Sequence, residues 1–455
     1  MAHHVTSADI AIHGDHLDTS SIAKVKTACL AIAVVGTLAS LWLLFWGPQP
    51  DPNAEIPAKG VTQGSYAYSW LFAFYYFLTL SMGGVFWTLL HNVSNSGWGT
   101  SVRRTFENLG ATYPWMILFC IPLLCPSVQQ YLYEWMNQHR EISDGGVLAS
   151  GAGHALHESK DPYDHLLYVK YWFMNLPFWY GRVLFYIVGL SAVIIFLRRL
   201  SVAQDTDPNP GVKRLFRARF HSTYTLIIFA LTITFTGFDF LMGMDYAWFS
   251  TMWGVYLFAG AALNSMAVII LVCTWLKSRG HLNHVTTSEH FHIMGKLLFA
   301  FTVFWAYIAF SQYFLIWYAN ITEETSYFLI RNTGHWHTAN IVLVVGHFVI
   351  PFIVLLQAWL KKNPKYLSIV AAYTLVMHAL DHYLISIPER GISLGKINPA
   401  FGDIQVSIPG AFWGDILAFV TLGAAFLFFL LRAIGQHSLY PNRDPRILES
   451  ANLSN

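Results

Sequence analysis

Ten long apolar runs dominate this sequence and limit what it can fold into. Each run approaches or exceeds the roughly 20 residues that an α-helix needs to cross the hydrocarbon core of a bilayer. The runs lie at residues 27–46, 66–90, 112–133, 172–197, 222–243, 249–276, 293–319, 338–360, 366–387 and 411–431. They predict an all-α integral membrane protein of about ten transmembrane helices, with an N-terminal segment at 1–26, a transmembrane domain at 27–431 and a C-terminal tail at 432–455.

The composition is that of a chain whose surface faces lipid. Only 11% of its 455 residues are charged and 55% are hydrophobic, whereas about 25% are charged in a typical soluble domain. The net charge of +2 gives no reason to expect a nucleic-acid partner. The cysteines, Cys29, Cys120, Cys125 and Cys273, fall within apolar runs and form no C-x-x-C pair. The chain is therefore expected to hold neither an iron–sulfur cluster nor a covalently attached c-type haem.

The distribution of Lys and Arg predicts how the helices are oriented. The two ends of the chain and every second connection carry 19 of the 27 basic residues, and the opposite connections carry 7. Because basic residues favour the cytoplasmic side, both termini are expected in the cytoplasm. The polar first 26 residues do not resemble the start of a signal peptide, so the first helix is expected to be retained. The long outer connections are expected to be covered by other subunits; they lie at 47–65, 134–171 and 388–410.

A few ionisable side chains lie inside the apolar runs. Placing a charge near the centre of a membrane helix costs about 2.5–3.5 kcal/mol, so side chains retained there are candidates for a function. The set comprises Arg182, Asp239, His347, His378, Asp381 and His382. All except Arg182, which is near mid-depth, fall in the outer half of their runs. Scattered structural histidines would not show this bias.

The sequence His-Ala-Leu-Asp-His in the ninth run is the strongest candidate. His378, Asp381 and His382 have i, i+3, i+4 spacing and therefore project from one face of a helix. Carboxylate and imidazole groups can both be tuned to exchange protons near neutral pH. We therefore predict a proton relay here, with Asp239 and His347 as neighbours. The alternative is a polar patch that only fixes helix packing, in a purely structural scaffold subunit.

Other interpretations use the same residues. His347 and His378 fall at equal depths on neighbouring antiparallel helices, so they are a candidate pair of ligands for a b-type haem in a membrane anchor. Arg182 is expected to border the same proton path, either as the counter-ion of Asp239 or another buried acid, which is favoured, or as a group that neutralises an anionic semiquinone. No four-ligand set has ordinary spacing, so no metal site is expected. A secondary transporter is less favoured, because the runs show no interrupted, inverted repeat.

Three segments resemble a known superfamily of membrane subunits. Residues 234–256, TFTGFDFLMGMDYAWFSTMWGVY, resemble the NrfD/polysulfide-reductase membrane subunits. Residues 310–328, FSQYFLIWYANITEETSYF, and 170–186, KYWFMNLPFWYGRVLFY, are similar to the branch called ActF. This branch is the second, shorter NrfD-like subunit of bacterial alternative complex III, a quinol:cytochrome c oxidoreductase.

The resemblance implies a fold and a set of partners in the bacterial inner membrane. The fold is two four-helix bundles, made of spans two to five and six to nine, flanked by the first and last helices. The partners are a larger NrfD-like quinol-binding subunit, an iron–sulfur subunit, multihaem and monohaem c-type cytochrome subunits and, in some complexes, a haem–copper oxidase. Iron–sulfur clusters and c-type haems then belong to the partners, so this chain is expected to carry no redox centre; quinol is the one ligand that the resemblance allows it.

Within the family, quinol oxidation is assigned to the larger subunit, and the second subunit is proposed to carry a proton path. The resemblance implies that Arg182, Asp239 and Asp245 match polar positions of the family's fourth and fifth helices.

Overall fold

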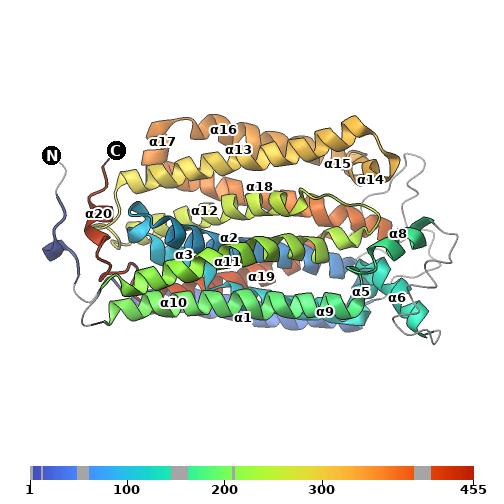
Figure 1. Ribbon diagram of the computed structural model, residues 1–455, viewed down its shortest axis with the longest axis horizontal. Helices are drawn as coiled ribbons and strands as arrows, with labels where there is room; N and C mark the ends of the chain where they lie inside the picture. Colours follow the sequence, from blue (N-terminus) through green and yellow to red (C-terminus); the bar gives the residue numbers. More distant parts are fainter. Residues whose placement is uncertain are drawn as a thin grey trace.

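The computed structural model describes residues 4–11, 14–48, 61–144, 162–207, 211–393 and 411–454, and the regular elements in those ranges are all helices. Nine of these helices are long and apolar enough to cross a membrane. They run along the long axis of the molecule, and the N- and C-terminal ends lie at the same end of it (Figure 1). The described part of the chain is therefore a multi-pass helical membrane protein.

The spanning elements follow the predicted runs in order. In the first half they are α1 (Thr19–Trp46), α2 (Gln63–Ser94), α9 (Leu176–Phe185) continued by η4 (Tyr186–Leu190) and α10 (Ser191–Asp205), and α11 (Lys213–Phe240) with η5 (Met242–Met244). In the second half they are α12 (Trp253–Ser278), α13 (Ser288–Ala319), α15 (His335–Leu343) continued by η6 (Val344–Val349) and α16 (Ile350–Leu355), α18 (Pro364–Ser393) and α19 (Phe412–Ile434). Nine of the ten predicted spans are confirmed.

Shorter helices lie at the two ends of the molecule. They are η1 (Ser7–Asp9), η2 (Trp98–Ser101), α6 (Glu134–Asp144), α8 (Pro162–Lys170), α14 (Thr322–Arg331), α17 (Ala358–Lys362) and α20 (Ile447–Ala451). Helices α6, α8 and α14 lie at the end opposite the two termini (Figure 1). The predicted outer connections at 47–65, 134–171 and 388–410 fall partly outside the described residues.

The third predicted span, 112–133, is a broken one. The chain runs through α3 (Arg103–Gly110), α4 (Tyr113–Met116) and η3 (Ile117–Leu124), then turns by 87° into α5 (Pro126–Leu132). Pro122 lies inside η3 and Pro126 begins α5. Because proline has no N–H and its ring clashes with the preceding turn, the two residues end one helix and start the next. The apolar run predicted the membrane segment but not this bend.

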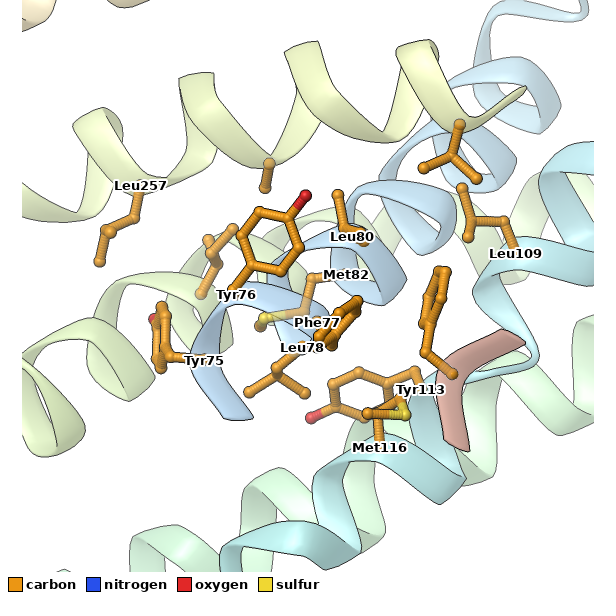
Figure 2. Close-up of a cluster of buried hydrophobic side chains, with 14 of the residues drawn as sticks. Tyr75, Tyr76, Phe77, Leu78, Leu80, Met82, Leu109, Tyr113, Met116 and Leu257 are labelled. Atoms are coloured by element: carbon orange, nitrogen blue, oxygen red, sulfur yellow. The ribbon is translucent and has the colours of Figure 1, made fainter. Parts of the chain in front are cut away.

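Helix α2 is the centre of the molecule. Of its most apolar window, 94% is buried, against 28% for α1. It packs against α3, α11, α12, α18 and α19. Figure 2 shows its side chains, Tyr75 to Met82, between Leu257 of α12 and the segment that carries Tyr113 and Met116. The other spanning helices therefore surround this aromatic helix.

The spanning helices of each half of the chain contact one another, and the two halves meet where α2, α3 and α11 pack against α12 and where α2 packs against α18. Helices α2, α3, α10 and α11 contact one another around the first half, and α12, α13, α16 and α18 do so around the second. Helix α1 packs against α19, along Gly36, where a Cβ atom would meet Thr421 at 2.2 Å. The last spanning helix thus covers the first spanning helix.

The C-terminal tail folds back onto the ends of the spanning helices. Arg103 donates to Asp444 at 2.7 Å, and Ser101 donates to Ser450 Oγ at 2.8 Å. The imidazole of His290, at the start of α13, also contacts Ser450 Oγ at 3.2 Å. The tail therefore joins both halves of the molecule at the end that carries the termini.

Candidate functional site

Asp381 lies at the meeting point of three spanning helices. It is buried on α18, and its two oxygens are held by different neighbours. The hydroxyl of Tyr256, on α12, donates to Oδ1, and the indole of Trp305, on α13, donates to Oδ2 at 3.2 Å. No basic residue pairs with this carboxylate at ion-pair distance within the described chain, apart from the imidazole of His378. The carboxyl group is thus oriented by neutral donors.

His378 stands one helical turn before Asp381 and faces it. Its Nδ1 lies 3.8 Å from Oδ2 of Asp381, and its Nε2 lies 3.4 Å from Oγ1 of Thr79 on α2. The ring also packs against Tyr76, with the two ring centroids 5.3 Å apart. The i, i+3 spacing therefore places imidazole and carboxylate together, as the sequence predicts.

His347 approaches the same carboxylate from the neighbouring span. It lies in η6, a π-helical turn, and its ring is fully buried. The imidazole centroid is 4.2 Å from that of Trp305 and 6.2 Å from that of His378. Neither ring nitrogen of His347 has a hydrogen-bond partner among the described residues. Single π turns are frequent at functional sites, because the extra residue re-aims a side chain.

His382 completes the group and extends it toward α2. Its ring centroid is 4.4 Å from that of His378 and 5.9 Å from that of Tyr75. The Tyr75 hydroxyl lies 3.3 Å from Oγ1 of Thr236 on α11. We refer to His347, His378, Asp381 and His382 as the His–Asp cluster. The structure brings together all four residues that the sequence singled out on the eighth and ninth spans.

Arg182 and Asp239 form a separate, closed pair, as predicted. The guanidinium donates to both carboxylate oxygens, at 2.8 and 2.6 Å, and Tyr186 donates to Oδ2 at 2.6 Å. Tyr186 is the first residue of η4, so this pair also adjoins a π-helical turn. Thr236 stands one turn before Asp239, and its hydroxyl lies 3.3 Å from that of Tyr75, whose ring packs against His382 of the His–Asp cluster.

Two cavities adjoin these groups. A cavity of about 610 Å³ is bordered by Asp381, Tyr256 and Trp305 and extends past Arg331 and Asn340. A second cavity, of about 270 Å³, is bordered by Arg182 and Asp239 on one side and by Asp245, which accepts from the backbone of Ala247 at 3.1 Å, on the other. Asp381 and the Arg182–Asp239 pair therefore border different cavities.

Sequence reasoning missed two buried ion pairs near the C-terminal end of α18. Arg390 donates to Asp415 at 2.7 Å, and Ser69 donates to the same oxygen at 2.6 Å. Arg331 contacts Glu389 at 2.9 Å. Glu389 and Arg390 escaped notice because the apolar run ends at 387, whereas α18 continues to Ser393. Asp415 lies inside the tenth run, so the criterion that selected Asp239 would have found it.

The partners of the His–Asp cluster were also missed. Tyr256, Trp305, Tyr75 and Thr79 lie in aromatic or apolar runs whose composition resembles ordinary core packing. Their hydroxyl and indole groups become informative only when three helices bring them to Asp381 and the imidazoles. No signal in the sequence distinguishes them from neighbouring aromatic residues.

The packing disfavours the haem interpretation. A porphyrin between His347 and His378 would need a flat space beside both rings. Trp305 fills this space next to His347, and the Asp381 carboxylate lies against His378. Neither histidine borders the larger cavity. One nitrogen from each of these rings and one oxygen of Asp381 do lie within 4.8 Å of one another, a three-ligand set that sequence spacing did not reveal.

Comparison of the sequence with models of protein families gives no match, and comparison with curated proteins gives none either. The functional argument therefore rests on the geometry of the site and on the three segments quoted above.

Proposed function

We propose that this chain is a membrane subunit of a respiratory quinol:cytochrome c oxidoreductase and that it provides a proton path in the outer half of the membrane. It would lie in a bacterial inner membrane with both termini in the cytoplasm. The resemblance of residues 170–186, 234–256 and 310–328 to subunits of alternative complex III supports this assignment. Both termini at one end of the molecule, and the excess of Lys and Arg in the connections on that side, support the orientation.

The observation that carries the proton path is a row of buried polar groups between Asp239 and Asp381. It runs past Thr236 and Tyr75, whose hydroxyls lie 3.3 Å apart, to the rings of His382 and His378, which pack against Tyr75 and against each other. The Nδ1 atoms of His378 and His382 have no hydrogen-bond partner among the described residues. A scaffold whose polar groups only satisfy one another would not leave them unpartnered, because each such group costs about 1–3 kcal/mol.

Protons would move along this row by short transfers. Asp381 borders the larger cavity and can receive a proton there, while Tyr256 and Trp305 hold its oxygens in place. The 3.8 Å gap to His378 is one that a water molecule or a small ring rotation closes. His382 then continues the path toward Tyr75 on α2. Arg182 fixes Asp239 at the far end as a bidentate partner.

The subunit would act within a complex. A larger NrfD-like subunit would oxidise quinol, and iron–sulfur and c-type cytochrome subunits would carry the electrons to cytochrome c or to a haem–copper oxidase. The two groups of contacting helices, around α2–α11 and α12–α18, support the two four-helix bundles that the resemblance implies. Lipid would cover the remaining apolar surface.

The test is the substitution Asp381→Asn in the intact complex. We expect quinol oxidation to slow and fewer protons to be released per electron, because the amide cannot accept and return a proton. The matched control is Asp444→Asn, a buried acid at the end of the molecule that carries the termini. Normal proton release in Asp381→Asn would rule out the relay. Mass spectrometry of the gently extracted complex tests the partners, and isolation of the chain alone would overturn the assignment.

A structural scaffold is the second candidate, and one observation favours it. The Arg182–Asp239 pair is fully satisfied, by two hydrogen bonds from the guanidinium and one from Tyr186. If the scaffold explanation holds, replacement of Asp381, His378 and His382 together leaves proton coupling unchanged in an assembled complex.

A further inference from the structure

Three members of the His–Asp cluster form a set of ligand atoms of the kind that holds a transition-metal ion. One nitrogen each from His347 and His378 and one oxygen of Asp381 lie within 4.8 Å of one another. The three side chains are 0–2% exposed. Imidazole and carboxylate are ligands that Zn²⁺ accepts, and three protein ligands are the number found where water completes the coordination.

The hydrogen bonds around His378 determine which of its nitrogens is available. Thr79 donates its hydroxyl proton to the carbonyl of Tyr76 at 2.7 Å. The same hydroxyl can therefore only accept from His378, so the proton of the neutral ring is on Nε2. Nδ1 then presents a lone pair to the Asp381 oxygen 3.8 Å away. Two acceptors that face each other are suited to hold a proton or a metal cation between them.

The surroundings of the set resemble the outer shell of a metal site. Ligating histidines commonly donate their second N–H to a neighbouring oxygen, as His378 does to Thr79, and ligating carboxylates are themselves hydrogen-bonded. Tyr256 and Trp305 hold Asp381 in this way. Neither nitrogen of His347 has a hydrogen-bond partner among the described residues, so no hydrogen bond has to break when the ring turns toward an ion.

The set must contract to bind an ion. Ligand atoms at about 2.0–2.1 Å from Zn²⁺ in tetrahedral geometry lie roughly 3.3 Å apart, so the widest pair has to close from its present spacing. Rotation of His347 supplies this movement without a shift of α18. Asp381 also borders the cavity of about 610 Å³, which gives the ion an approach and room for a water ligand.

We propose that His347, His378 and Asp381 bind a divalent transition-metal cation of the Zn²⁺ type and that the bound ion blocks the proton path. The inhibition rests on the proposed function, whereas the binding of the ion does not. An ion coordinated by His378 and Asp381 occupies the same lone pairs that would accept a moving proton. The site would therefore make proton coupling sensitive to the metal content of the outer compartment.

Binding is tested directly on the intact complex with Zn²⁺, and with Co²⁺ as a coloured probe. We expect one equivalent per chain to survive desalting and Co²⁺ to give the visible absorption of a low-coordinate nitrogen–oxygen site. His347→Gln and Asp381→Asn should weaken binding by about 100-fold or more, since each removes one of three ligands. Asp381→Glu keeps a carboxylate and should retain part of the affinity, which separates ligand loss from misfolding.

Two control variants give the comparison. His382→Gln changes the same cluster outside the ligand set, and His292→Gln removes a surface imidazole that lies 3.4 Å from Glu289. Both should bind the ion as the unmodified complex does. No bound equivalent, or equal binding by His347→Gln and Asp381→Asn, would overturn the site.

The two proposals fail in different ways. In the unmodified complex Zn²⁺ should lower the number of protons released per electron, whereas adding Zn²⁺ to His347→Gln should not change the number that this variant releases without the ion. Ion binding with no change in proton release would overturn the proton path and leave the ion site. Loss of proton release in Asp381→Asn, together with no ion bound by the unmodified complex, would overturn the ion site and leave the proton path.

Discussion

The hydroxyl of Tyr256 donates a hydrogen bond to Oδ1 of Asp381 and ties α12 to the acidic residue of α18. Together with the indole of Trp305 it fixes the carboxylate on the side that faces His378. The orientation of one buried acid therefore depends on two helices that contribute no charge to the site. The substitutions below test this arrangement and the packing around it.

Removal of the Tyr256 hydroxyl should disturb proton release without changing the charge of the site. In Tyr256→Phe, Asp381 keeps only the bond from Trp305 and can turn away from His378. We expect proton release to slow by about tenfold, which corresponds to 1.4 kcal/mol and lies near the lower end of a charge-assisted hydrogen bond. Stopped-flow measurement with a pH dye checks this. Tyr313→Phe, on the wall of the same cavity, is the control and should be normal.

Breaking the Arg182–Asp239 pair on one side should destabilise the protein. Arg182→Met leaves a buried carboxylate with only Tyr186 as a donor. Loss of one partner of a buried ion pair costs about 3–5 kcal/mol, so we expect a clear drop in the thermal midpoint of the detergent-solubilised protein. Adding Asp239→Asn should restore most of the loss, because no charge is then left unpaired. A double variant as unstable as the single one would contradict this account.

Arg331 and Pro388 should show energetic coupling. Pro388 has no N–H and so leaves the carbonyl of Leu384 without its helical partner. Arg331 donates to that carbonyl at 2.9 Å and to the carbonyl of Ile385 at 2.7 Å. We expect Arg331→Met to be destabilising by about 3–5 kcal/mol, because it removes two hydrogen bonds of a charged donor and leaves the buried Glu389 without its partner.

In a Pro388→Ala background the same change should cost less, since the alanine N–H can satisfy the Leu384 carbonyl. Thermal unfolding of the four proteins in this double-mutant cycle measures the coupling. Equal costs in the two backgrounds would show that the Leu384 carbonyl plays no part in what Arg331 contributes to stability.

His139, outside the spanning helices, should make stability depend on pH. It is buried on α6, where its Nε2 contacts the carbonyl of Met174 at 2.8 Å. Burial lowers the pKa of the imidazole, and the bond to Met174 opposes this only in part. The unfolded chain therefore binds more protons than the folded one below about pH 6.5.

The stability that the neutral His139 imidazole contributes is thus fully present above about pH 6.5 and is lost as the pH falls. We expect His139→Gln to flatten the dependence of the thermal midpoint between about pH 7.5 and 5.5, the interval around the histidine pKa. His335→Gln, which replaces the histidine that begins α15, is the control and should keep the slope. An unchanged slope in His139→Gln would assign the pH response to another group.

The lengths of the apolar runs predicted most of this fold, because a membrane-spanning helix is recognised from its own run of residues and not from the residues that it contacts. The bend at Pro126 was not predicted, since the residues on both sides of it are equally apolar. The i, i+3, i+4 spacing correctly placed His378, Asp381 and His382 on one face of α18. Contacts with His347 and Trp305 could not be derived, because they depend on how neighbouring helices are rotated about their axes.

The burial of α2 has a consequence for how the protein is made. Its most apolar window has a mean hydropathy of 1.4, against 2.3 for α1, and carries several tyrosine and serine hydroxyls. A newly synthesised α2 meets lipid before α11, α12, α18 and α19 exist, and those helices later replace that lipid almost completely. During biogenesis, therefore, the most central helix of the finished protein must wait in lipid, to which its hydroxyl groups are poorly suited, until its partners are made. Its retention by the insertion machinery until the later helices arrive becomes a condition for correct assembly.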